Sequence, residues 1–241
     1  MKINSTMSYV SGYISDVGTV KKLNQDLNGC YRKDTGCGEI IMAFVCDGKG
    51  GVSRGDVAAH TVGREFIRWL EEVPDDIADY PASIKSDWEE MIEELNERIW
   101  GYGQQRQIKL GSTLTVILLL PNGTYYAANV GHSRLYLFDQ SGFQRLMENS
   151  EIDEYGFPVP RIGNRSFVTP CFTNGRVQKG EGVLLCTDGF FQRFPEQEMV
   201  EALKGQPKTE EEIAGLLSSM VEKIKQCGER DNISAVIVKS N

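Results

Sequence analysis

Short apolar runs recur along the chain, bounded by glycine, asparagine or charged residues, and this pattern is typical of buried β-strands. We expect the run at Ile40–Cys46 to end at once, because Gly48, Gly50 and Gly51 follow it. Asn122-Gly123 predicts a hairpin turn. The predicted strands are Tyr9–Ile14, Ile40–Cys46, Ser112–Leu120, Thr124–Val130, Arg134–Phe138, Val183–Cys186 and Ile233–Lys239.

Three other segments have apolar residues at helical spacing. The first ends before Pro74, and the second carries glutamates on its polar face. The third extends from about Glu210 to Gln226, with Thr209 and Glu212 as a capping-box pair and Gly228 as its stop. The apolar stripes are Val57, Ala58, Thr61, Val62, Phe66, Trp69 and Leu70; Trp88, Met91, Ile92, Leu95 and Ile99; and Ile213, Leu216, Leu217, Met220 and Ile224.

The order of these elements predicts an α+β layered sandwich. Consecutive strands joined by hairpins form antiparallel sheets, and the helices cover them. A length of 241 residues, of which 40% are hydrophobic, fits one domain spanning residues 1–241. The dinucleotide and P-loop glycine fingerprints are excluded, because neither follows a strand and begins a helix here.

Charge and composition narrow the possible partners and location. The chain has 26 basic and 34 acidic residues, for a net charge of -8, which argues against nucleic-acid or anionic-membrane binding. We find no signal peptide within residues 1–10 and no apolar run long enough to span a bilayer. The six cysteines include no CxxC pair, Cys46 and Cys186 fit core positions, and we expect reduced thiols in a cytoplasm.

Four aspartates stand where strands or turns begin or end. Asp47 and Asp188 each follow an apolar run and precede glycine, Asp231 precedes the last strand, and Asp26 is expected to precede a turn. A single Asp-Gly pair is typical of an ordinary turn. Several carboxylates gathered without a counter-ion would repel one another and raise one another's pKa, and bound divalent cations would remove this repulsion. Oxygen ligands with few histidines favour Mg²⁺ or Mn²⁺ over zinc.

These residues fall within six motifs that occur in order along nearly the whole chain, from about Tyr9 to Lys239. The motifs are Ser15–Gly18 with Asn24–Asp26, Val45–Gly51, Gly111–Leu114, Ala128–Arg134, Leu185–Gly189 and Arg230–Asn232. In this order and spacing the chain resembles the metal-dependent protein phosphatases of the 2C type. The resemblance implies a four-layer α-β-β-α sandwich, with two antiparallel sheets flanked by helices and two Mn²⁺ or Mg²⁺ ions at one end.

The resemblance also assigns roles to individual residues. Asp47 would bridge both metals, and the Gly48 carbonyl would bind the second metal. Asp188 and Asp231 would bind the first metal, while Asp26 would act directly or through a metal-bound water. A water activated between the two cations would attack phosphorus in line.

Two lysines depart from the family pattern. Lys21 stands where the family usually has an arginine that grips the substrate phosphate, and lysine supplies the charge without the bidentate fork. Lys49 stands where eukaryotic relatives often have a histidine and bacterial relatives a methionine. It could donate a proton or attract phosphate, although an unperturbed pKa of about 10.4 makes lysine a poor acid at neutral pH. A solvated side chain is the alternative for both.

Two further departures remove carboxylates. His132 replaces an aspartate, and Gln192 replaces a frequently acidic residue, in the region that the family links to a third metal. We therefore expect a weak or absent third site. The family also places a mobile flap between Phe143 and Gly182, where this chain has Gly156, Pro158, Pro160, Gly163 and Asn164.

The predicted function is that of a Mn²⁺- or Mg²⁺-dependent phosphatase for phosphoserine and phosphothreonine in proteins. The resemblance favours a monomer in a bacterial cytoplasm, acting on a phosphoprotein made by a cognate serine/threonine kinase. The main alternative is a pseudophosphatase, a phosphoprotein-binding regulatory domain with weak or no activity. A second alternative is a phosphatase dedicated to a sigma-factor antagonist.

Overall fold

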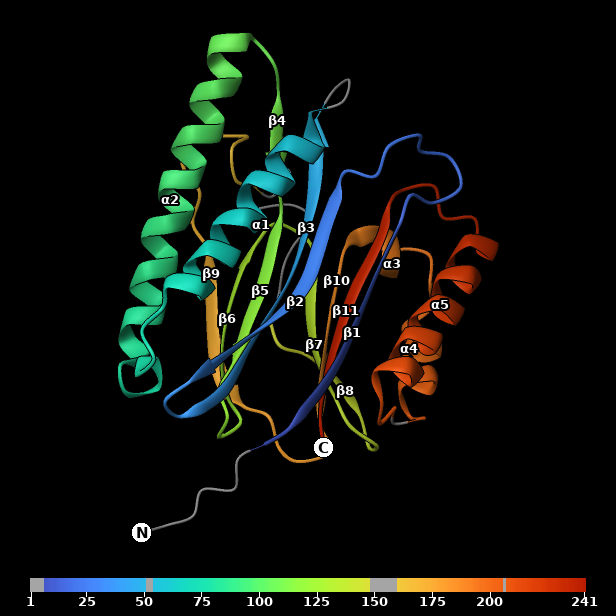
Figure 1. Ribbon diagram of the computed structural model, residues 1–241. Coiled ribbons are helices and arrows are strands. Elements are labelled where there is room, and N and C mark those ends of the chain that lie inside the picture. The colour runs from blue at the N-terminus through green and yellow to red at the C-terminus, as the bar shows by residue number, and fades with distance from the viewer. Residues whose placement is uncertain (1–6, 51–53, 148–159, 206) are drawn as a thin grey trace.

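Two antiparallel sheets form the centre of the molecule in the computed structural model, which describes residues 7–50, 54–147, 160–205 and 207–241 (Figure 1). One sheet has the order β1-β11-β10-β7-β8, and the other has the order β2-β3-β5-β6-β9 with β4 paired to β3. The strands are β1 Tyr9–Asp16, β2 Asp26–Thr35, β3 Gly38–Gly50, β4 Leu110–Ser112, β5 Leu114–Leu119, β6 Thr124–Val130, β7 Arg134–Phe138, β8 Phe143–Arg145, β9 Cys171–Arg176, β10 Gly182–Cys186 and β11 Ile233–Ser240.

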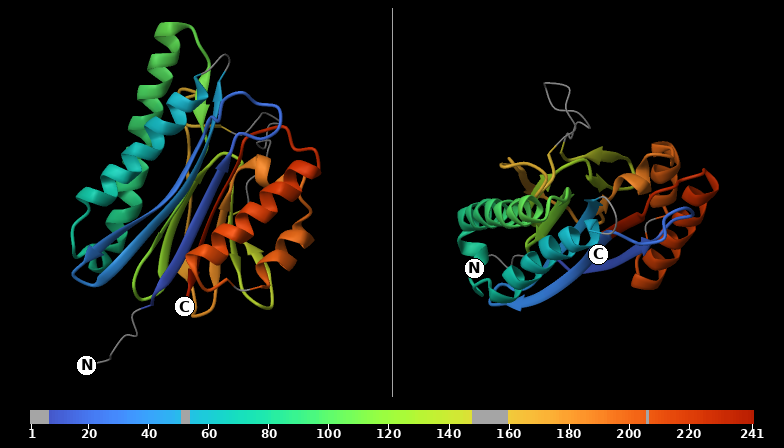
Figure 2. Two further views of the ribbon diagram at one scale, coloured as in Figure 1. Left: turned by 45° about the vertical axis from the view of Figure 1, so that its right-hand side comes forward. Right: turned by 90° about the horizontal axis from the view of Figure 1, so that it is seen from above.

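Helices cover the outer face of each sheet, so the predicted four-layer α-β-β-α sandwich is confirmed. In the view from above, α1 (Gly55–Glu72) and α2 (Pro81–Arg106) lie on one side, and α4 (Glu196–Leu203) and α5 (Glu210–Gln226) lie on the other (Figure 2). The short helix α3 (Asp188–Phe191) follows β10, and a 3₁₀ turn at Ile77–Asp79 joins α1 to α2.

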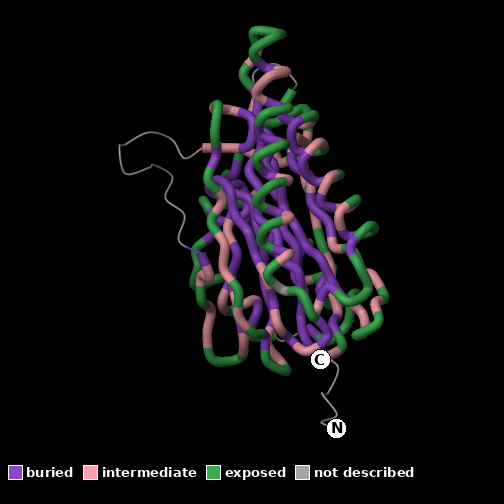
Figure 3. Tube along the Cα trace, turned by 90° about the vertical axis from the view of Figure 1, so that its left-hand side faces the viewer, coloured by how far each residue is buried: buried purple, intermediate pink, exposed green. Residues whose placement is uncertain are grey.

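Strand β3 shows how the sequence divides between the layers. Ile41, Ala43 and Val45 pack in the core between the two sheets, while Met42 and Phe44 pack against α1 and α2. Side chains alternate between the two faces of a strand, so a strand that is buried on both faces reads as a continuous apolar run. Figure 3 shows the same division, with buried strands behind helices whose outer turns are exposed.

Most predicted strands and all three predicted helices are confirmed, but two boundaries are wrong. Strand β3 does not end at Cys46 but continues to Gly50, because Gly48 and Gly50 pair with Ser112 and Leu110 of β4; Gly51 lies outside the described residues. Asp26 does not precede a turn, because it begins β2 and pairs with Asp47 across the sheet. In both places pairing with a neighbouring strand outweighs the local preference of the residues for a turn.

Smaller predictions have mixed outcomes. The predicted strand Ser112–Leu120 is divided into β4 and β5 at Thr113. The Thr209 side chain accepts a hydrogen bond from the Glu212 N–H at 3.2 Å, so the predicted cap of α5 is confirmed. Val57 was placed on the buried stripe of α1 but is exposed. Within the described residues, no helix combines the length and apolarity needed to cross a membrane.

Candidate metal centre

The four predicted aspartates reach the same end of the sandwich from four different segments. Asp26 and Asp47 lie side by side on β2 and β3, Asp188 begins α3, and Asp231 precedes β11. Asp26, Asp47 and Asp188 are buried, with 7%, 3% and 8% of their surfaces exposed, whereas the Asp231 side chain is 28% exposed. Burial of three carboxylates in one place is costly unless cations balance them.

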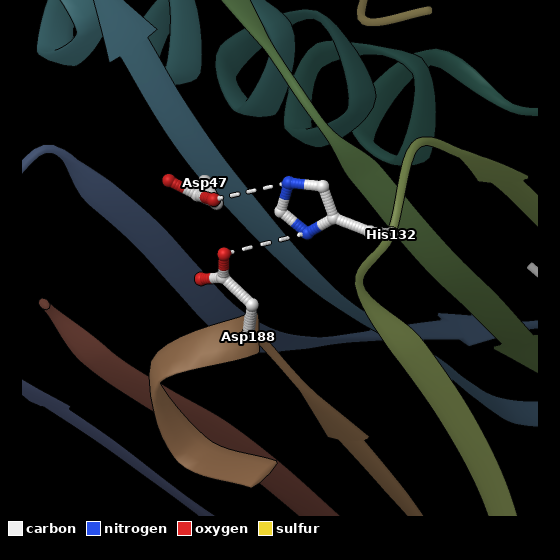
Figure 4. Close-up of side chains that lie close together, drawn as sticks. All are labelled: Asp47, His132 and Asp188. Carbon is white, nitrogen blue, oxygen red and sulfur yellow. Dashed lines mark ion pairs between the residues drawn. The ribbon is translucent and has the colours of Figure 1, made fainter. Parts of the chain in front are cut away.

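A histidine lies between two of these aspartates. His132 Nε2 is 3.8 Å from Asp47 Oδ2, and His132 Nδ1 is 3.7 Å from Asp188 Oδ2 (Figure 4). One potential ligand atom from each of these three residues lies within 4.8 Å of the others. The sequence places this histidine in the region of the third metal, and the structure brings it into the central group.

Two lysines contact Asp231, and one of them, Lys49, also connects it to this group. The Lys49 ammonium lies 2.7 Å from Asp231 Oδ2, 3.3 Å from Asp47 Oδ2 and 3.7 Å from Asp188 Oδ2. Lys21 lies 3.2 Å from the other Asp231 oxygen, Oδ1, at the more exposed rim of the site. Both lysines that the sequence singled out therefore contact predicted metal ligands.

The pKa values reflect the crowding of negative charge. Burial, followed by the neighbouring Asp188 carboxylate, raises the pKa of Asp47 to about 6. Burial and the Asp47 carboxylate raise the pKa of Asp26 well above its ordinary value, although the Thr187 hydroxyl donates a hydrogen bond to Asp26 Oδ2 at 3.0 Å. Burial by itself would raise the pKa of Asp231, but the hydrogen bond and charge of Lys49, together with the Asn232 N–H and the charge of Lys21, outweigh burial and lower this pKa.

The residues present fit divalent cations. Asp47 Oδ2 is buried and accepts no hydrogen bond from the described residues, and its contact with the Lys49 ammonium at 3.3 Å is an ion pair only, so this oxygen is a candidate metal ligand. The three close carboxylates are hard oxygen ligands of the kind that Mg²⁺ and Mn²⁺ prefer, and a nearby cation would lower the raised pKa values. Gly48 lies against the first turn of α1, where an added Cβ would come within 2.1 Å of the Gly55 carbonyl oxygen.

Arg161 determines which ring nitrogen of His132 carries the proton. Its Nη2 is 2.7 Å from His132 Nε2, and a guanidinium can only donate, so Nε2 accepts and the neutral ring carries its proton on Nδ1, toward Asp188. Burial lowers the pKa of His132 to about 4, with the positive charges of Arg161 and Lys49 acting in the same direction. Sequence reasoning missed Arg161, since nothing around it in the sequence links it to His132.

The Gly111–Leu114 motif holds the backbone of Asp47. The Thr113 hydroxyl accepts a hydrogen bond from the Asp47 N–H at 2.9 Å and bonds the Ser133 hydroxyl at 2.8 Å. The Thr113 N–H donates to the Asp47 carbonyl at 2.9 Å. This buried network makes Thr113 a positioning residue for Asp47.

Asn232 ties the loop between β1 and β2 to Asp231. Its amide nitrogen donates to the carbonyls of Val17 and Leu23, and its Oδ1 accepts from the Gln25 N–H at 2.9 Å. Gly189 allows the Asp231–Asn232 segment to approach α3, because a Cβ there would lie 2.0 Å from the Asn232 carbonyl oxygen. Glycine after Asp188 is therefore required by close backbone packing.

Other predicted positions lie outside the central group. Gln192 is exposed, and its N–H donates to the Asp188 carbonyl at 2.9 Å. In the predicted flap, Ile162 pairs with Ser112 of β4, and the Gly163 N–H donates to Asn96 of α2 at 2.8 Å. The flap positions Gly156 and Pro158 lie outside the described residues.

Known proteins resemble this chain in sequence and in fold. The family model described as "Protein phosphatase 2C" matches residues 19–228. The "Serine/threonine phosphatase stp" of Listeria innocua is 27% identical, over 94% of each chain. The S. agalactiae serine/threonine phosphatase structure has a TM-score of 0.79 at 18% identity, over 96% of this chain and 99% of that one. The catalytic domain of the phosphatase PstP, solved with two manganese ions, has a TM-score of 0.77 at 20% identity, over 98% of both chains.

Proposed function

Because the chain belongs to the protein phosphatase 2C family, we propose that it is a metal-dependent hydrolase of phosphoserine and phosphothreonine in proteins. The observation that carries the proposal is that Asp47, Asp188 and Asp231 each place a carboxylate oxygen within 3.7 Å of one point, the Lys49 ammonium, while Asp26 pairs with Asp47 across the sheet. Two divalent cations, Mn²⁺ or Mg²⁺, would be held by these four aspartates and the Gly48 carbonyl. The expectation that a third cation site is weak or absent remains a prediction.

When bound, the cations would supply Lewis-acid polarisation of the phosphoryl group and a lowered pKa for a coordinated water. The chain's own residues set the conditions for that chemistry. Thr113 and Ser133 fix the Asp47 backbone through buried hydrogen bonds, so its carboxylate is oriented in advance. Lys21, on the more exposed side of Asp231, is placed to exchange its carboxylate partner for a phosphate oxygen, which supports its predicted role in binding substrate.

The proposed substrate is a phosphoprotein, which the names of the serine/threonine phosphatase relatives support. Three further predictions accompany the proposal. We expect that a cognate serine/threonine kinase makes the substrate, that the protein is a monomer, and that it is located in the cytoplasm. The acidic net charge of -8 is consistent with a protein partner and not with nucleic acid.

Metal-dependent turnover by the wild type and by matched aspartate variants tests the proposal. We expect hydrolysis of p-nitrophenyl phosphate and of a phosphothreonine peptide only with added Mn²⁺ or Mg²⁺. Asp47→Asn and Asp188→Asn should each lower kcat by at least about a hundredfold. Asp75→Asn, an exposed aspartate in the loop after α1, is the control and should leave the rate unchanged. Turnover in EDTA, or full activity in both site variants, contradicts the proposal.

The alternative of a binding domain without turnover is favoured by one observation, the position of Lys49 against three predicted metal ligands. A folded wild type that binds the phosphothreonine peptide but does not hydrolyse it in any cation would support this alternative. Binding is measured by fluorescence anisotropy, with the unphosphorylated peptide as the control.

A further inference from the structure

Lys49 occupies an unusual position for a cationic side chain in a metal site. It lies on β3 two residues after Asp47, and side chains two apart on a strand point to the same face. Pairing of Lys49 with Gly111 of β4 keeps this part of the strand extended. The ammonium is thereby directed into the group of carboxylates, where it contacts Asp47, Asp188 and Asp231.

The oxygens that Lys49 contacts are the oxygens that a divalent cation would need. Asp231 Oδ2 is 2.7 Å from the ammonium, and Lys21 and the Asn232 N–H already contact Asp231 Oδ1. Asp47 Oδ2 accepts no hydrogen bond from the described residues and has the Lys49 ammonium at 3.3 Å. A divalent cation and an ammonium on the same oxygens would repel each other strongly at such short distances.

We propose that Lys49 is a tethered cation that competes with divalent metal for Asp47, Asp188 and Asp231, and so sets the metal concentration at which the site is filled. This inference rests on the proposed function, because it requires that these carboxylates bind metal. Lysine suits the role because it is a point charge on a flexible four-carbon stem, which can leave as a cation enters.

The structure provides a place for the displaced ammonium. Lys49 also lines a cavity of about 530 Å³ between the end of α2, β4 and the segment at residues 161–164. Trp100, Gln104 and Asn164 line the same cavity, so the stem can lie on an aromatic surface while the ammonium contacts amide oxygens. In this proposal, metal binding changes the conformation of the Lys49 side chain and leaves strand β3 in place.

Mn²⁺ titration of the metal-free protein by isothermal calorimetry tests the competition directly. At about pH 8, protons compete little with metal for a carboxylate whose pKa is about 6. We expect Lys49→Met to lower the Kd for Mn²⁺ by about tenfold or more, and Lys49→Arg to keep the weaker affinity. Lys109→Met is the matched control: Lys109 lines the same cavity and is exposed, so its loss should change the Kd by less than about threefold.

Thermal unfolding separates competition from a purely structural role. Lys49→Met should lower the Tm of the metal-free protein, which loses a counter-ion, and should leave the Tm of the Mn²⁺-saturated protein equal to that of the wild type. A structural role would lower both values equally.

The outcomes distinguish this inference from the proposed function. An unchanged or weaker Kd in Lys49→Met, with wild-type binding intact, overturns the inference alone. Absence of Mn²⁺ binding by every variant overturns both. Binding by Lys49→Met but not by the wild type supports the competition in its strongest form.

Discussion

Asp47→Asn should stabilise the metal-free protein, although it removes a central residue of the site. Burial, followed by the charges of the Asp188 and Asp231 carboxylates, raises the pKa of Asp47 from 3.8 to about 6. A rise of this size means that ionised Asp47 destabilises the folded state by about 3 kcal/mol at neutral pH. Asparagine has nearly the same shape and carries no charge, so the substitution should recover most of that free energy.

The effect should depend on pH in a defined direction. The folded-state pKa of Asp47 lies above the unfolded value of 3.8. Asp47 therefore lowers the free energy of unfolding of the wild type only at pH values at which its carboxyl group ionises. The advantage of the variant should therefore be absent near pH 4, grow as the pH rises to about 6, and stay constant above it. For a domain of this size, about 3 kcal/mol corresponds to a rise in Tm of roughly 6–12 °C.

Urea unfolding in EDTA, followed by circular dichroism at several pH values, measures this difference. Asp75→Asn, on the exposed loop after α1, is the control and should shift stability by less than about 0.5 kcal/mol at every pH. Saturating Mn²⁺ should reverse the order, because the wild type gains stability from bound metal and the variant does not. A variant that is less stable than the wild type in EDTA at neutral pH would refute the account of buried charge repulsion.

Three further substitutions test individual contacts. Lys21→Arg should lower the KM for a phosphopeptide with little change in kcat, because a guanidinium can bind phosphate through two parallel hydrogen bonds. Steady-state kinetics measure both constants, and an unchanged KM argues against a role of Lys21 in binding phosphate. Thr113→Val should cost about 1–3 kcal/mol in urea unfolding, because the buried Asp47 N–H loses its hydroxyl acceptor, and Thr113→Ser should restore it. Gly189→Ala should destabilise the fold by about 1–3 kcal/mol and weaken Mn²⁺ binding, because the added Cβ would lie 2.0 Å from the Asn232 carbonyl oxygen. A wild-type Kd for Mn²⁺ in calorimetry would contradict the expected loss of metal affinity.

The sequence predicts those elements of the fold whose apolar pattern can be recognised from the local sequence alone. Strands β3, β5 and β11 are almost wholly buried and read as apolar runs. Strands β2 and β9 were missed because their sequences, DLNGCYRKDT and CFTNGR, are largely polar. Both lie at the edges of their sheet and are held by backbone pairing with β3 and β6, which local composition does not encode.

The site shows a similar division. The motifs identified Asp26, Asp47, Asp188 and Asp231, and the structure brings them to one end of the sheets. The motifs also identified Lys49 as unusual. The direction of its side chain, however, depends on the continuation of β3 to Gly50, and the glycines in this segment predict that the strand ends earlier. Contacts such as the one between Arg161 and His132 join segments that no local pattern relates.

Charge balance connects the two lysines to the chemistry proposed for the site. Lys21 and Lys49 contact three of the four carboxylates, and Arg161 contacts His132 beside them, so with all four carboxylates ionised the group has only a small negative excess. Two divalent cations would turn that excess into a positive one. A phosphate dianion would then restore the balance, and a Lys49 ammonium displaced from Asp47 would add to the attraction. Metal and phosphate should therefore bind with positive coupling, each raising the affinity for the other by the same factor.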